Sequence, residues 1–211
     1  YTGCISLKSI GDMPKLESMG QKCFVSCTTL ETVGDLSSLK EIPSETFDGC
    51  TSLVSIGDLS NVESIANEAF SNCSALEHVD KLDKITSIGQ NAFKGCTALK
   101  SIGSLHNLET IGKGAFNGCS ALEHVDDLYS LTRLEYDVFS HCVSLISVDC
   151  SDKLTAIGSS AFFGCKALVS IGDLSNVTSI ESSVFRGCIA LKSIGNMPKL
   201  ESIGMQCFMG C

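Results

Sequence analysis

The chain has 211 residues, a mass of 22.3 kDa and a net charge of −9, from 15 basic and 24 acidic side chains. Its 44% apolar content is too high for a disordered acidic tail, and its acidity argues against nucleic acid and anionic membrane surfaces as partners. No run of about 18 apolar residues predicts a membrane span, and no signal peptide opens the chain.

Cysteine and phenylalanine set a strict period. Ten of the 13 cysteines recur every 23 residues, and nine of the ten phenylalanines follow the same interval. A fixed period of about 20–50 residues indicates stacked supersecondary units. We therefore predict one array over residues 1–211, made of nine units that begin at Cys4, Cys27, Cys50, Cys73, Cys96, Cys119, Cys142, Cys165 and Cys188. Because neither terminal unit carries a polar cap, we expect the chain to be a fragment of a longer array.

The elements of one unit follow from its apolar positions, counted from the cysteine as position 1. These are positions 4, 7, 10, 13, 16, 20 and 21. A spacing of three suits neither a straight helix nor a flat strand, but it suits short extended pieces separated by bends. We predict a strand at positions 4–8, a second extended piece at 13–16 and a single helical turn at 18–22. Position 23 is Gly, Ser, Asn or His, and Gly, Asn and His tolerate a positive φ best.

The unit from Cys96 to Gly118 carries the motif C-x-x-L…L-x-x-I-G-x-x-A-F-x-x-C. All nine units resemble the 23-residue leucine-rich repeats of BspA-like (Treponema-type) surface proteins. The resemblance implies an α/β repeat solenoid, a right-handed horseshoe with a parallel sheet. It also implies no catalysis, a cell-surface or extracellular location, and adhesion to a protein such as a host matrix or cell-surface protein. One departure from the family pattern recurs in most units. Positions 9 and 10 are mostly Asp-Leu, where the family has an apolar residue and proline.

Two repeated columns have competing interpretations. The stacked cysteines could form disulfides, but side chains in register point in parallel, which favours thiols packed as small apolar residues. The aspartates at positions 8 and 9 could form a cation-binding ladder, but carboxylates that accept backbone N–H groups in a turn are favoured. Cys23-x-x-x-Cys27 is not a zinc spacing, and we predict no metal site.

The candidate partner-binding residues are those that break the repeat on its outside. On the outward strand positions, Glu77-His78 and Glu123-His124 recur two units apart, so the imidazoles would lie about 10 Å apart, too far to share a metal. Unit six departs most from the consensus, and large residues follow it at position 22 of later units. Tyr and Arg are enriched in binding hot spots, but weakened consensus is a competing explanation. The residues are Tyr129, Arg133, Tyr136, His141, Phe163 and Arg186.

No nucleophile elbow, phosphate loop, zinc-protease motif or dinucleotide fingerprint occurs, so we predict no enzyme and no cofactor. The leading hypothesis is a non-catalytic recognition or adhesion module on a cell surface. Two alternatives stay open: a structural protein whose bare ends self-associate into a filament or sheath, and an intracellular interaction scaffold.

Overall fold

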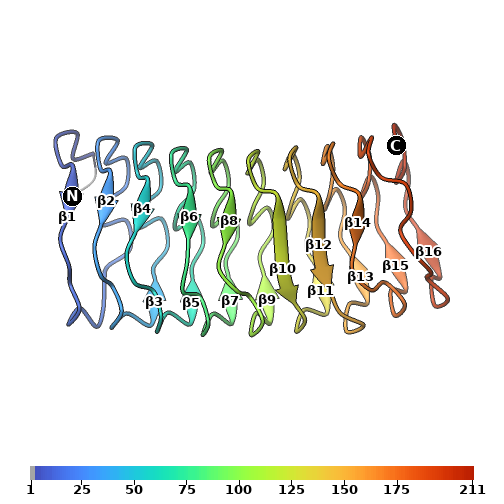
Figure 1. Cartoon of the computed structure of the whole chain (residues 1–211), viewed down its shortest axis with the longest axis horizontal. Coiled ribbons are helices and arrows are strands. Elements are labelled where there is room, and N and C mark those ends of the chain that lie inside the picture. Colours follow the sequence, from blue (N-terminus) through green and yellow to red (C-terminus); the bar gives the residue numbers. More distant parts are fainter. Residues whose placement is uncertain (1–2) are drawn as a thin grey trace.

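The computed structural model describes residues 3–211 and shows a stack of coils that runs from the N-terminal end to the C-terminal end (Figure 1). Paired strands in neighbouring coils are parallel, and their partners lie 23 residues apart, as in Ser9↔Thr32 and Ile10↔Val33. We number the coils 1 to 9 from the cysteine that begins each repeat. The predicted parallel-strand solenoid is confirmed.

Each regular coil contributes one strand to each of two ladders. In both ladders the first residue of a strand points outward, and the second points toward the interior. The first ladder uses positions 6 and 7, within the predicted strand at 4–8. Its strands are β1 (Ser9–Ile10), β2 (Thr32–Val33), β4 (Ser55–Ile56), β6 (His78–Val79), β8 (Ser101–Ile102), β10 (His124–Leu128), β12 (Ser147–Cys150) and β14 (Ser170–Ile171).

The second ladder uses positions 15 and 16, at the end of the predicted extended piece at 13–16. Its strands are β3 (Glu41–Ile42), β5 (Ser64–Ile65), β7 (Ser87–Ile88), β9 (Thr110–Ile111), β11 (Arg133–Leu134), β13 (Ala156–Ile157), β15 (Ser179–Ile180) and β16 (Ser202–Ile203).

The interior is filled by the predicted apolar columns. Side chains such as Leu53, Leu76 and Leu99 at position 4 are fully buried, as are seven of the nine column phenylalanines. The phenylalanine rings stack in one row from Phe24 to Phe208, with centroids 5.2 to 5.7 Å apart and planes inclined by no more than 17°. This distance lies in the range of favourable aromatic contacts, so the row links every coil to the next.

The column cysteines behave as the packing interpretation predicts. From Cys50 onward they are thiols, and each donates its S–H to the carbonyl of the phenylalanine 26 residues earlier, as Cys50 does to Phe24 at 3.0 Å. Burial raises the pKa of the Cys96 thiol to about 12. A thiol that stays protonated at neutral pH is a poor nucleophile, so these cysteines are structural.

The predicted helical turn at positions 18–22 is wrong, because residues 3–211 contain no helix. Position 19 has a positive φ in every coil, as in Glu45 (54°) and Asn91 (54°), and so does position 23, as in Gly49 (72°). A residue in the left-handed region interrupts a right-handed helix. Alternate N–H groups are also used between coils, since Phe47 N–H donates to Ala69 O at 2.8 Å. The segment, which we call the turn ladder, is therefore a set of consecutive turns. The left-handed residue predicted at position 23 is confirmed.

Glycine at position 8 permits the close approach of neighbouring coils in the first ladder. A Cβ on Gly57 would lie 2.4 Å from the Gly34 carbonyl oxygen, and the Gly57 N–H donates to Val33 O at 2.8 Å. Coil 6 carries Asp126 at this position, the next residue Asp127 takes a φ of 65°, and β8 and β10 are not paired. The second ladder is also interrupted there, between β9 and β11.

Candidate functional site

The exposed side of the turn ladder collects three of the predicted residues. His141, Phe163 and Arg186 come from coils 6, 7 and 8 and lie side by side, because positions 22 and 23 stack on their equivalents in the next coil. The His141 ring meets the Phe163 ring edge-on, with centroids 5.1 Å apart, and the Arg186 guanidinium lies 5.7 Å from the centre of that ring. We call these three residues the aromatic–cation cluster.

The cluster is partly open to a partner. His141 is exposed, and Phe163 and Arg186 are half-buried. Arg186 Nη1 also donates to Gln206 Oε1 at 3.0 Å, which fixes the guanidinium over the ring. A cation held on an aromatic face is energetically significant, about 0.5–1 kcal/mol at exposed sites. The cluster therefore presents an aromatic ring and a guanidinium in a fixed arrangement at the surface.

Tyr136 lies on the same side of the molecule but lines a hollow formed by coils 4, 5 and 6. The hollow has a volume of about 420 Å³, and Lys94 and Lys113 line it on the other coils. Tyr136 is 48% exposed, and the neighbouring Asp137 carboxylate raises its pKa. Burial raises the pKa of Asp137, although hydrogen bonds from Tyr136 and Ser140 and the charge of Lys94 oppose this effect.

Arg133 does not join this surface. It lies on the second ladder, where its guanidinium pairs with Glu181 of coil 8 and lies 3.3 Å from Glu135. Glu181 Oε2 also accepts hydrogen bonds from the Ser159 N–H at 3.0 Å and the Ser159 hydroxyl at 2.9 Å. Arg133 lowers the pKa of Glu181. These contacts make Arg133 a link between coil 6 and coil 8.

Tyr129 is also separate from the aromatic–cation cluster. It is 45% exposed and follows β10, in the bend between the two ladders. Its N–H donates to Asp127 O at 2.8 Å. Partial burial raises the pKa of Tyr129, and the negative charges of Asp127 and Asp149 raise it further. Its surroundings are acidic, unlike those of Tyr136.

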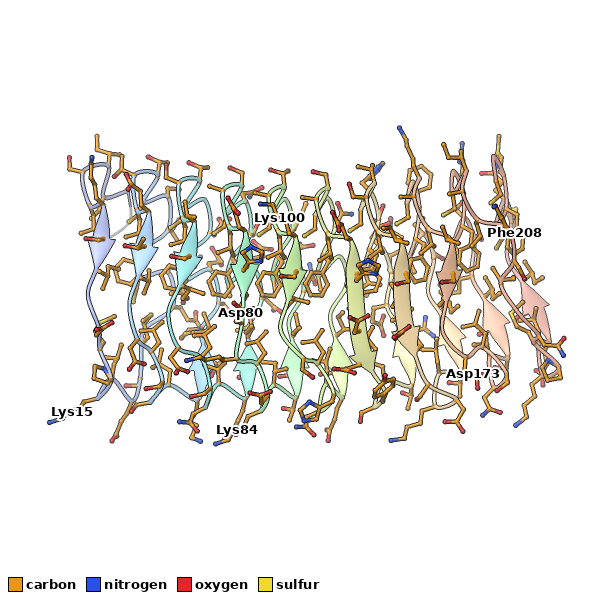
Figure 2. The ribbon with its side chains drawn as sticks, viewed as in Figure 1. Lys15, Asp80, Lys84, Lys100, Asp173 and Phe208 are labelled. Carbon is orange, nitrogen blue, oxygen red and sulfur yellow. The ribbon has the colours of Figure 1, made fainter. Side chains whose placement is uncertain are left out.

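The two Glu-His pairs lie on the outer face of the first ladder. His78 Nδ1 is 2.8 Å from Ser101 Oγ, and Glu77 pairs with Lys100 at 2.8 Å (Figure 2 labels Lys100). Lys100 lowers the pKa of Glu77. His124 Nδ1 repeats the arrangement with Ser147 Oγ at 2.9 Å. The partner of Glu77 is a lysine of the next coil, so contacts between neighbouring coils occupy this part of the face. Glu123 lies next to His124 and forms no such ion pair in residues 3–211.

Aspartates at position 9 accept hydrogen bonds as the turn interpretation predicts. Asp35, Asp58 and Asp173 each accept the N–H of the residue two positions later, at 2.7 to 2.8 Å. Asp58 also pairs with Lys81 at 2.7 Å, and this contact lowers its pKa to about 2. Within residues 3–211 no group of three or more His, Cys, Asp or Glu side chains could hold a metal ion.

The residues that sequence reasoning missed are those of the hollow beside Tyr136. Lys94, Lys113, Asn91 and Asn117 are single departures spread over two repeats, and no linear motif joins them. One signal was available: position 19 carries glycine only in coil 5, at Gly114. A missing side chain at a position that stacks in register predicts a depression in the surface.

The fold, the strand register and the buried columns define the class of this protein: it is a leucine-rich repeat solenoid. The BspA type leucine rich repeat region model (6 copies) matches residues 1–100 and 86–211. The chain belongs to this BspA-type family, as the repeat motif predicted.

Solved structures support the same fold. A leucine-rich repeat protein of Bacteroides ovatus is 30% identical over 97% of this chain, with a TM-score of 0.73. A leucine-rich repeat protein of Eubacterium ventriosum is 15% identical over the whole chain and 87% of its own length, with a TM-score of 0.58. This chain spans 58% of the Bacteroides ovatus chain.

A search of curated proteins found no match. In the described part of the chain, no helix has the length and apolar character that crossing a membrane requires.

Proposed function

We propose that this protein is a non-catalytic recognition module of a cell-surface leucine-rich repeat protein, and that it binds a protein partner through the aromatic–cation cluster. The observation that carries the proposal is the contact of His141, Phe163 and Arg186 across three coils. Phe163 and Arg186 stand at position 22, where coils 3 and 5 carry Ser71 and Asn117, and His141 stands at position 23, where most coils carry glycine. Aromatic and arginine side chains dominate binding energy at protein interfaces.

Membership of the BspA-type family supports the cell-surface location and the adhesive role. Catalysis is disfavoured because the cluster offers a cation and an aromatic ring but no nucleophile beside a general base. The structural and scaffold alternatives stay predictions. Sedimentation at increasing concentration separates the structural alternative from the recognition module, since a filament former would polymerise and a recognition module would stay monomeric.

The test is binding of the chain to a panel of purified extracellular-matrix and cell-surface proteins by biolayer interferometry. Phe163→Ala and Arg186→Ala should each weaken binding of a captured partner at least tenfold, as expected for hot-spot residues. The matched control is Val169→Ala, which truncates an exposed apolar residue on the first ladder of coil 8. Equal binding by all three variants would contradict the assignment of the site.

A further inference from the structure

The hollow formed by coils 4, 5 and 6 lies outside the aromatic–cation cluster and has its own chemistry. Its volume of about 420 Å³ falls within the range of roughly 300–1,000 Å³ that is typical of small-ligand pockets. It is open to solvent on one side and is lined by side chains from positions 18, 19 and 22 of the turn ladder. We propose that this hollow binds a saccharide that carries a carboxylate, such as a uronic acid residue.

The charge of the hollow selects an anion. Lys94 and Lys113 line it from adjacent coils, and within residues 3–211 neither ammonium group lies within ion-pair distance of a carboxylate. Lysines that stack beside a carboxylate of a neighbouring coil do form ion pairs, as Lys40 does with Glu63 at 2.9 Å. Asp137 supplies one negative charge at the rim. Two ammonium groups against one carboxylate leave one positive charge in excess, which suits a singly charged anion.

The remaining lining suits a sugar ring. Gln90, Asn91 and Asn117 present carboxamides, which both donate and accept and therefore match hydroxyl groups. Neither Gln90 nor Asn117 uses its side-chain amide in a hydrogen bond within residues 3–211. Tyr136, 48% exposed, forms a wall with an apolar face and a polar hydroxyl. Carboxamides, an aromatic face and a cation together recognise a saccharide better than a bare carboxylate.

Gly114 makes the hollow. A Cβ at this position would lie 2.5 Å from Asn91 Oδ1, so any side chain would enter the space. Its φ of 61° matches that of Asn91 (54°) and Asp137 (56°), the same position in the coils before and after. Coil 5 therefore keeps the backbone of the column and removes only the side chain. Gly114→Asn places a side chain in the hollow on a backbone that asparagine adopts one coil earlier, and the end of the Asn91 side chain must shift to admit the new Cβ.

The experiment is an NMR titration of the chain with three probes: D-glucuronate, the neutral sugar D-glucose, and N-acetyl-aspartate blocked as its N-methylamide, a singly charged acid without a sugar ring. Glucuronate should bind saturably and shift the amide signals of residues 90–94, 113–117 and 136–137. Glucose should bind at least tenfold more weakly, because it lacks the carboxylate. Uniform shifts over the surface, or N-acetyl-aspartate binding as tightly as glucuronate, would overturn the proposal; the second result would identify an acidic peptide site.

Variants separate the pocket from general charge. Lys94→Ala and Lys113→Ala should each weaken glucuronate binding about tenfold, and Gly114→Asn should abolish it while leaving every charge in place. The control is Lys15→Ala, which removes the same single charge at coil 1, away from the hollow, where Figure 2 labels Lys15. An equal loss in this control would overturn the proposal. Phe163→Ala should leave glucuronate binding intact, so failure of this site and failure of the proposed protein-binding site are distinguishable.

Discussion

Coil 3 and coil 6 are built on the same repeat, yet they stack on their predecessors differently. In coil 3, Gly57 lets the backbone approach closely, and its N–H donates to Val33 O at 2.8 Å. In coil 6, Asp126 replaces that glycine, β8 and β10 are unpaired, and β9 and β11 are unpaired as well. At this junction the turn ladder persists, with Phe116 N–H donating to Val138 O at 2.9 Å. The difference teaches that the turn ladder and the phenylalanine row continue across a junction where both strand ladders are interrupted.

The exposed departures from the repeat lie near this junction. The hollow and the aromatic–cation cluster occupy coils 4 to 8, on both sides of the interrupted ladders. Coil 4 shares part of the deviation, since Asp80 stands at position 8 and β4 pairs with β6 only at Ser55↔His78. Aspartate at position 8 does not by itself prevent pairing, since coil 7 carries Asp149 there and its strand β12 pairs with β10.

The largest expected effect comes from the phenylalanine row. Phe70→Ala and Phe139→Ala each remove a fully buried ring, and each should lower the free energy of unfolding by about 3–5 kcal/mol. They should differ in cooperativity. Phe139 lies beside the interrupted ladders, so its loss should split denaturant unfolding into two transitions, whereas Phe70→Ala should keep one. Far-UV circular dichroism and the near-UV signal of the tyrosines and phenylalanines, both followed in urea, measure the number of unfolding transitions. Identical single transitions would show that the interruption does not weaken coupling.

Exchange of the position-8 residues comes next. Gly57→Asp should destabilise the chain by about 1–3 kcal/mol, because its Cβ would press on the Gly34 carbonyl. The reciprocal change Asp126→Gly should restore a ladder bond worth about 1 kcal/mol. Amide hydrogen exchange at residue 126 should then slow. Unchanged exchange at that amide would mean that another feature of coil 6 causes the interruption.

A smaller effect is expected for the ion pairs. Arg133→Ala removes the link between coil 6 and coil 8, and Lys40→Ala removes the regular Lys40–Glu63 pair. Both pairs are exposed, so each change should cost less than about 1 kcal/mol. We expect Arg133→Ala to cost more, because Glu181 also holds Ser159 and would lose its fixed position. Thermal unfolding of the two variants measures which change costs more stability, and a larger loss in Lys40→Ala would contradict the prediction.

The smallest expected effect is a dependence on pH in the regular region. The ordinary pKa of an aspartate is about 3.9, and in the folded chain Lys81 and the Ser60 N–H lower the pKa of Asp58 to about 2. Because the folded value is the lower one, the stabilisation is fully present above about pH 4 and is lost as pH falls toward 2. An NMR titration of the Asp58 carboxyl should show the low pKa, and Lys81→Ala should return it toward the ordinary value. A pKa near 4 in the unmodified chain would contradict this.

Much of the fold could be predicted from the sequence, and less of the site. The period, the strand positions, the buried columns and the thiol state of the column cysteines follow from residue types that repeat 23 apart. The helical turn was predicted wrongly, because a short stretch such as Gln90–Gly95 reads as a helical turn in a single coil. The segment forms consecutive turns and not a helix, because alternate N–H groups donate to carbonyl groups of the next coil. Arg133 illustrates the limit for the site, since the sequence marks it as unusual but does not reveal its partner Glu181 two coils away.

The sequence by itself determined that this protein is a solenoid of uniform coils, because each repeat buries its apolar face only against its neighbours. The tertiary structure decided which exposed departures meet. Tyr136 faces Lys94 and Lys113, while His141 faces Phe163 and Arg186. Stacking places residues 23 or 46 positions apart side by side, and the kinds of side chain that meet there decide whether they line a hollow, join a cluster or link two coils.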